Sequence, residues 1–404
     1  MTAQSPPVLL VSRTLVAAAI SVIPVLMMMG EDWRLVYGAL IGCLTLLVAA
    51  GSFERLNLAA LGRIGLTSLL LVVPILLSTL VNRPEDPRLE NLVVIACYAV
   101  FAPLVLSSPL EESSRSMFNQ MILWMGVAAI IVLHEAAEGD LLEALLDRRN
   151  SFDFEGINLH PNYIGLMGTV MGVAAVGIRR TALMGLVFAA AFGISLVVES
   201  RAGLLSIAAA VLCACLGRLS GPLTPERKRA ILMLGMAGLL VLVYMARSTS
   251  ALEFLQDEVL MIDDSNRGLD SGFTDRTELW KATWNLWTEN LLFGVGYGQH
   301  TEVLGMGTYA HNMVLILLAD TGLLGLLGFT AFSAICLMHG RRLFRQGQRN
   351  AATTLVTAVV VYWVYGIFEG RAVNAGNPLS AVFFLITFAG MAEVAPSPTP
   401  LVPR

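Results

Sequence analysis

Three side chains in this sequence have the chemistry to act on a charged, hydroxyl-bearing substrate: Arg201, Arg276 and His311. Arginine presents a planar fork of N–H donors that pairs with carboxylates and phosphates. Histidine changes its protonation near neutral pH and accepts a proton from a hydroxyl. These residue types indicate anion binding and general-base chemistry, provided that the fold brings them together.

Two of these residues, Arg201 and His311, also have a simpler structural interpretation. Arg201 can form a salt bridge with Glu199 or extend toward lipid headgroups. His311 can cap the apolar segment that it opens. Asp320 follows His311 by nine residues, about 13 Å along a helix, so it is too distant to orient that histidine. We predict that Asp320 is a buried polar partner within the helical bundle.

Arg276 lies in the segment GFTDRTELWKATWNLWTEN, which predicts a helix. Asp275 followed by Glu278 resembles a capping box that would start this helix near residue 276. An arginine there lies where backbone N–H groups and the helix dipole favour an anion. Two arginines on one face suit a pyrophosphate. Three tryptophans recur at helical spacing and predict a face that anchors the helix in the membrane interface: Trp280, Trp284 and Trp287.

The elements that must position these residues are transmembrane helices. The chain has 404 residues, of which 56% are hydrophobic and 14% charged, against about 25% charged in soluble domains. The net charge of -4 provides no basic field for nucleic acid. We predict an all-α integral membrane protein with about 12 transmembrane helices. The predicted spans are roughly 12–30, 34–52, 63–81, 91–108, 117–134, 162–178, 182–198, 201–218, 229–247, 311–337, 352–368 and 377–394.

Lysine and arginine are concentrated in the short connections on one side of these spans, which predicts that both termini are cytoplasmic. The other, outer side carries two long loops, at about 135–161 and 248–310, and we expect short amphipathic helices in the longer one. Residues 1–396 are predicted to form a single membrane domain. Residues 397–404 look like the remnant of a cleavable tag.

Unusual polar residues from distant parts of the chain all map to the outer side. We therefore predict that Arg201, Arg276 and His311 converge on one cavity there. Glu369 maps to the same side, where span 352–368 ends. Second-rank candidates for substrate binding are His160, Asn162, Asn312 and Arg371. No metal-ligand or nucleophile motif is found, so no metal or cofactor is expected. The glycine-rich stretch 294–298 is predicted to be a turn rather than a nucleotide-binding loop.

Three sequence blocks resemble the conserved blocks of the O-antigen ligase and O-antigen polymerase superfamily: SRAG at 200–203, DRTELWKATWNLWTENLLFGVGYG and HNMVLILLADTGLLGLLGF. The HPNYIG segment at 160–165 also fits, and the resemblance covers roughly residues 155–330. It implies a GT-C-like membrane glycosyltransferase of the bacterial inner membrane. Such an enzyme takes a glycan from undecaprenyl pyrophosphate at the periplasmic face, without a metal.

The resemblance also implies roles for the candidate residues. Arg201 and Arg276 match arginines that bind the donor pyrophosphate, and His311 matches the catalytic histidine. We predict an inverting O-antigen ligase of lipopolysaccharide biosynthesis, with lipid A–core as its acceptor. A polymerase that uses a second lipid-linked repeat as acceptor shares these motifs and stays open. A transporter of lipid-linked glycans is a second alternative, although polar residues clustered on one side weigh against it.

Overall fold

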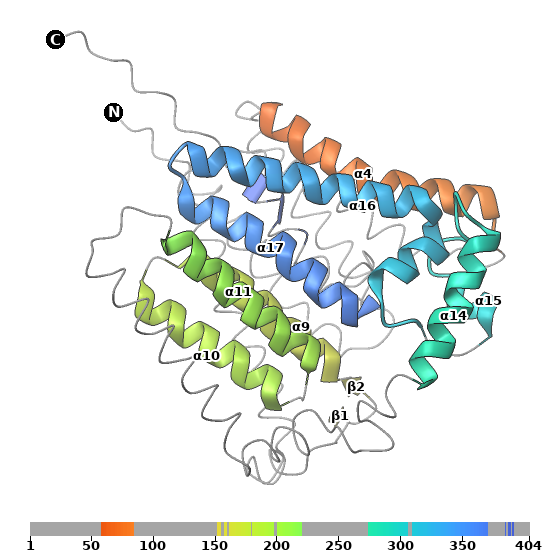
Figure 1. Ribbon diagram of the computed structural model, residues 1–404, viewed down its shortest axis with the longest axis horizontal. Coiled ribbons are helices and arrows are strands. Elements are labelled where there is room, and N and C mark those ends of the chain that lie inside the picture. The colour runs from red at the N-terminus through yellow and green to blue at the C-terminus, as the bar shows by residue number, and fades with distance from the viewer. Residues whose placement is uncertain are drawn as a thin grey trace.

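In the computed structural model, residues 58–84, 152–154, 157–159, 161–178, 180–197, 200–219, 274–305 and 309–370 are described, together with Phe384, Thr387, Phe388, Gly390 and Met391. Figure 1 shows their arrangement as a bundle of helices with a small hairpin at one end. The helices are α4 (Leu58–Asn82), α9 (Pro161–Val176), α10 (Thr181–Val197), α11 (Arg201–Leu219), α14 (Thr274–Glu289), α15 (His300–Leu304), α16 (Met313–Arg345) and α17 (Arg349–Phe368). The strands are β1 (Phe152–Phe154) and β2 (Ile157–Leu159).

Six of the predicted spans correspond to helices of the structure, namely α4, α9, α10, α11, α16 and α17. Three segments are long and apolar enough to cross a membrane: Leu61–Asn82, Met313–Arg345 and Arg349–Phe368. The apolar parts of α9, α10 and α11 are shorter. The predicted spans 12–30, 34–52, 91–108, 117–134 and 229–247 lie outside the described residues, and 377–394 is described only in part. The total of about twelve spans stays a prediction.

The hairpin is an element that the predicted all-α architecture lacks. Strands β1 and β2 are antiparallel and pair Phe152 with Leu159, Asp153 with Asn158 and Phe154 with Ile157. Apolar and polar residues alternate along both strands, which is the pattern of a strand with one buried face. The hairpin lies in the predicted loop 135–161 and leads to α9. Apart from it, the elements of the described residues are helical.

The helices pack in an order that follows from short connections. Helices α9, α10 and α11 pack against one another, as the two short turns between their spans predict. Helix α17 packs against both α11 and α16, and α16 also contacts α4 and α14. Aromatic rings fill the core between α16, α17 and the last described segment: Phe329, Phe332, Tyr362, Trp363, Phe384 and Phe388.

The long helix α16 is interrupted at Gly322, where φ is 66° and ψ is −164°. Only glycine adopts such angles readily. The stretch between α14 and α15 fills the interruption. Leu323 N–H donates to the Leu291 carbonyl at 2.8 Å, and Val295 N–H donates to the Ala319 carbonyl at 2.8 Å. The predicted turn at 294–298 is therefore also the segment that satisfies the backbone groups freed by the break.

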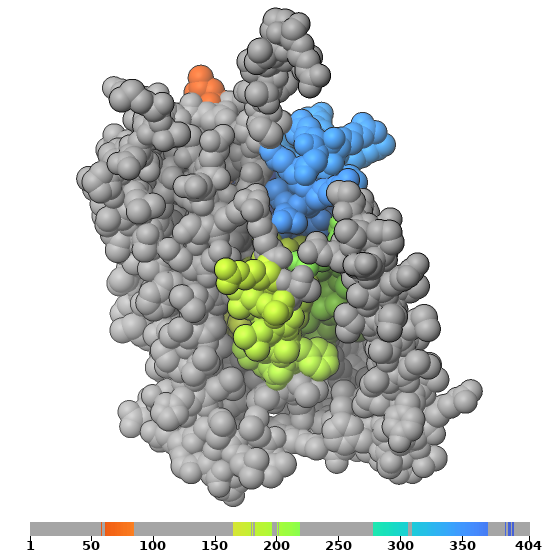
Figure 2. Space-filling view, turned by 90° about the vertical axis from the view of Figure 1, so that its left-hand side faces the viewer, coloured from red at the N-terminus to blue at the C-terminus, as the bar shows by residue number. Residues whose placement is uncertain are grey.

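Several exposed arginines lie at one end of the bundle. The C-terminal end of α16 carries three exposed arginines, Arg341, Arg342 and Arg345, and Arg180 is exposed before α10. Figure 2 faces this end, where the α16–α17 turn (blue) and α10 (yellow-green) reach the surface. Helix α14 and the hairpin lie at the other end (Figure 1). The cytoplasmic and outer sides assigned from the sequence stay a prediction.

The break in α16 gives a first prediction. A Cβ at Gly322 would overlap the backbone of Leu292, whereas a Cβ at Gly305, where φ is 62°, meets nothing within 4 Å. We expect Gly322→Ala to lower the free energy of unfolding by about 3 kcal/mol or more. The matched Gly305→Ala carries only the left-handed backbone cost of about 1–2 kcal/mol. Denaturant titration of the two proteins in detergent micelles measures both, and equal losses would contradict the docking of residues 291–296 in the break.

Candidate functional site

His311 occupies a strained backbone position immediately before α16. Its φ of 46° lies in the left-handed region, which costs a non-glycine residue on the order of 1–3 kcal/mol. Asn312 follows as the N-cap of α16, and its Oδ1 accepts hydrogen bonds from the N–H groups of Val314 and Leu315 at 3.0 and 3.2 Å. The cap holds the sharp entry into the helix. Strain maintained in this way is typical of functional sites.

The ring of His311 pairs with a buried carboxylate. Its Nδ1 lies 2.8 Å from Oε1 of Glu369, and the two side chains are 20% and 3% exposed. The Tyr309 hydroxyl donates to the second oxygen, Oε2, at 3.2 Å. Beside an ionised carboxylate, which only accepts hydrogen bonds, a neutral His311 donates from Nδ1 and presents the lone pair of Nε2. This is the arrangement of a general base whose orientation is set by an acid.

Glu369 reaches the histidine because α17 ends beside the start of α16. It forms the C-cap of α17. A Cβ at the next residue, Gly370, would overlap the side chain of Ile316, so the chain approaches α16 closely at this point. Asn312 Nδ2 adds a hydrogen bond to the Ile367 carbonyl at 3.3 Å. Two helices that pack against each other thus carry the two members of the pair.

Helix α14 carries Arg276 near its N-terminal end. The helix begins two residues before the predicted start, so the predicted capping box is wrong, and Arg276 lies in its first turn. One turn later, Trp280 Nε1 donates to the Ala310 carbonyl at 2.6 Å. Residues four apart share a helix face. Arg276 therefore lies on the face of α14 that contacts the residue preceding His311.

The three tryptophans of α14 do not have a common environment. Trp280 is tied to the loop of His311, whereas Trp284 is 47% exposed and its ring packs 4.7 Å from that of Trp287. The buried face of α14 is formed instead by three other residues, namely Leu279, Thr283 and Leu286. An interfacial anchoring role stays a prediction for Trp284 and Trp287.

Arg201 is the first residue of α11, and its position depends on small neighbours. Ser200 precedes it, and the Ser200 Oγ accepts a hydrogen bond from the Gly203 N–H at 3.2 Å, as an N-cap does. A Cβ at Gly165 of α9 would overlap Ser200, so glycine is what permits this close approach. Helix α11 begins at the end of the bundle where α17 ends with Glu369 (Figure 1).

Comparison with known families finds a similarity for the segment that carries most of the candidate residues. Residues 184–330 match the family model described as O-antigen ligase. This segment of the chain is therefore similar to the O-antigen ligase family. The resemblance predicted from the sequence blocks is confirmed, and the match supports a transferase activity in general terms. No curated relative matches the chain.

The segment that matches the O-antigen ligase family spans α10, α11, α14, α15 and the first half of α16. It includes Arg201, Arg276 and His311 and ends before Glu369. Among the second-rank residues, Asn162 is the second residue of α9, and Asn312 caps α16. His160 and Arg371 lie outside the described residues.

Glu369 is the residue of the candidate site whose contact with His311 sequence reasoning did not predict. Its place on the outer side follows from the topology, yet the sequence does not show that it touches His311. The only available signal was an acid at the end of a span. The prediction that Asp320 is a buried partner too distant to orient His311 is confirmed, because Asp320 is 3% exposed and contacts His300 instead.

Trp280 gives a second prediction. The Trp280→Phe variant keeps an aromatic ring but removes the indole N–H that donates to the Ala310 carbonyl. Ala310 is fully buried. We expect a loss of about 1–3 kcal/mol in the free energy of unfolding, because a buried acceptor loses its partner. Trp284→Phe, at an exposed position on the same helix, should stay within about 0.5 kcal/mol of the parent protein. Denaturant unfolding in detergent measures the free energy of unfolding of both variants. Comparable losses in the two would argue against the hydrogen bond from Trp280 to Ala310.

Proposed function

We propose that this protein is an O-antigen ligase that transfers a glycan from undecaprenyl pyrophosphate to lipid A–core. The reaction takes place at the periplasmic face of the bacterial inner membrane, with both termini cytoplasmic, and it requires no metal. The observation that supports this proposal is the His311–Glu369 pair, at 2.8 Å. It lies at the end of the bundle where the helices of Arg201 and Arg276 begin (Figure 1).

Arg201 and Arg276 bind the donor pyrophosphate. Both lie in the first turn of a helix, where unpaired backbone N–H groups and the helix dipole add to the attraction for an anion. Negative charge grows on the pyrophosphate as the glycosidic bond breaks. Fixed cations therefore stabilise the transition state more than the bound donor, which is the requirement for catalysis.

His311 is the general base. Its Nε2 accepts the proton of the acceptor hydroxyl while the hydroxyl oxygen forms a bond to the anomeric carbon of the donor sugar. The bond between that carbon and the phosphate oxygen breaks, and the pyrophosphate leaves with the electron pair. The Glu369 carboxylate holds Nδ1–H and stabilises the imidazolium that forms. Attack from the side opposite the leaving group inverts the anomeric centre.

Glycan transfer by the purified protein tests the proposal. The protein in detergent is given undecaprenyl-pyrophosphate-linked glycan with lipid A–core in one reaction and the donor alone in another, both with EDTA. We expect glycan-bearing lipid A–core in the first. Longer lipid-linked chains in the donor-only reaction would instead identify a polymerase, and the absence of product in both would reject glycan transfer between these substrates.

Substitution of the three residues tests their roles in the same assay. We expect transfer to fall by about 10²–10³-fold in Arg201→Ala and in Arg276→Ala, and by about 10²–10⁴-fold in His311→Ala. Arg345→Ala removes an exposed arginine at the opposite end of the bundle and should leave transfer unchanged. A folded variant with parental turnover would remove its residue from the mechanism.

Glu369→Gln gives a separate prediction. The amide is close in shape to the carboxylate but lacks the charge that stabilises the imidazolium, and it also offers a donor to Nδ1. We expect turnover to fall by about 10²–10⁴-fold with little change in the KM of the acceptor. Glu302→Gln, at an exposed acid on α15, is the matched control. Turnover of Glu369→Gln near that of Glu302→Gln would show that the carboxylate does not assist His311.

A further inference from the structure

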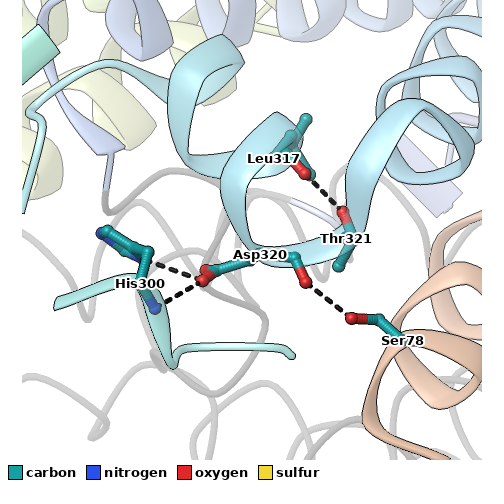
Figure 3. Close-up of polar contacts among 5 residues, drawn as sticks. All are labelled: Ser78, His300, Leu317, Asp320 and Thr321. Carbon is teal, nitrogen blue, oxygen red and sulfur yellow. Dashed lines mark hydrogen bonds and ion pairs between the residues drawn. The ribbon is translucent and has the colours of Figure 1, made fainter. Parts of the chain in front are cut away.

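A second histidine–carboxylate pair lies deeper in the bundle. Figure 3 shows His300, the first residue of α15, against Asp320 of α16. Oδ1 of Asp320 lies 2.8 Å from the ring Nδ1 of His300 and 3.2 Å from its backbone nitrogen. The two side chains are 6% and 5% exposed. This pair is more enclosed than the His311–Glu369 pair, and its members contact each other through both ring and backbone.

The backbone around Asp320 is bonded from two further elements. The Asp320 carbonyl accepts hydrogen bonds from Ser78 Oγ of α4 at 2.6 Å and from the Gly296 N–H at 3.2 Å. Asn82, also on α4, donates to the Gly294 carbonyl at 3.1 Å. A network of α4, α16 and the 291–300 segment therefore surrounds the pair, at the point where α16 is interrupted.

A buried carboxylate is costly unless it is paired, and an apolar pair of similar volume would often be at least as stable. Stability alone therefore gives a weak account of His300 and Asp320. What the pair provides is geometry. The pair connects α16 to the end of the segment that follows α14. The hydrogen bond from Trp280 to Ala310 connects the first half of α14 to the residue before His311. These two contacts, one on α14 and one just after it, define the placement of α14 against α16.

We infer that His300 and Asp320 are positioning residues for the transfer reaction. By holding residues 291–300 in the break of α16, they set the distance between the first turn of α14, with Arg276, and the start of α16, with His311. This inference rests on the proposed function. The pair does not touch the substrates, and it acts through the placement of Arg276.

Two variants at each position separate loss of the hydrogen bond from loss of the side chain. His300→Ala removes the ring donor, whereas His300→Asn places an amide N–H close to the position of Nδ1. Asp320→Ala removes the acceptor, whereas Asp320→Asn keeps an amide oxygen in its place. His339→Ala is the matched control, because His339 is also a buried histidine and lies toward the other end of α16.

Two measurements on the purified protein show how each substitution changes the docking of residues 291–300 and the rate of transfer. Hydrogen exchange of peptides covering residues 291–300 and 319–324 reports whether the segment stays docked, without reference to activity. Transfer kinetics with the donor and lipid A–core report turnover, in both the parent protein and an Arg276→Ala background. We expect faster exchange and about a 10- to 100-fold lower kcat in His300→Ala and Asp320→Ala. The asparagine variants should stay close to the parent in both measurements.

The Arg276→Ala background decides whether the pair acts through the arginine. If it does, His300→Ala should cause little further loss of turnover there, because the group that it positions is already absent. Equal fold losses in the two backgrounds would overturn the positioning role and leave a structural one. Parental exchange and turnover in His300→Ala and Asp320→Ala would overturn the inference entirely, as would an equal loss of turnover in His339→Ala.

Failure of the proposed function has a different signature. If Arg276→Ala alone has parental turnover, the arginine has no role in transfer, and positioning through it is rejected as well. Faster exchange of residues 291–300 in His300→Ala would then still show that the pair holds the segment in the break. The two results are therefore read from independent measurements.

Discussion

The architecture depends on the satisfaction of backbone hydrogen bonds at the break in α16. Inside a membrane no water is available to replace a lost helical bond, so each freed N–H and carbonyl must find a partner within the protein. The carbonyl of Ala319 would ordinarily accept from the N–H of Leu323. In this structure it accepts from Val295, while Leu323 donates to Leu291. The break is therefore paired from outside the helix, and it binds the segment after α14 to α16.

This exchange of partners explains why the candidate site is built from the ends of several helices. Helix α14 cannot shift freely along α16, because the chain that follows it is fixed in the break. The Trp280 indole then connects its first half to Ala310, and the Asn312 cap and Glu369 hold the other side of His311. A left-handed backbone at a histidine is maintained because these contacts surround it.

Much of this organisation follows from the sequence, because apolar length, basic connections and polar outliers are local signals. They predict α4, α9, α10, α11, α16 and α17 and assign Arg201, Arg276 and His311 to one side. Pairings across the chain leave no such signal. Glu369 meets His311 from 58 positions away, and His300 meets Asp320 from 20 positions away. The interruption at Gly322 also escapes periodicity, because the hydrophobic pattern continues through it.

The two histidine–carboxylate pairs share one distance and differ in exposure, and this difference separates their roles. Both join Nδ1 to a carboxylate oxygen at 2.8 Å. His311 keeps 20% of its side chain exposed, so its second nitrogen can meet a hydroxyl from outside the protein. His300 is 6% exposed and also gives its backbone N–H to the same oxygen, which suits a contact that aligns two segments rather than one that meets a substrate. We therefore propose that one chemical motif serves proton transfer where it is open and alignment of the helices where it is closed.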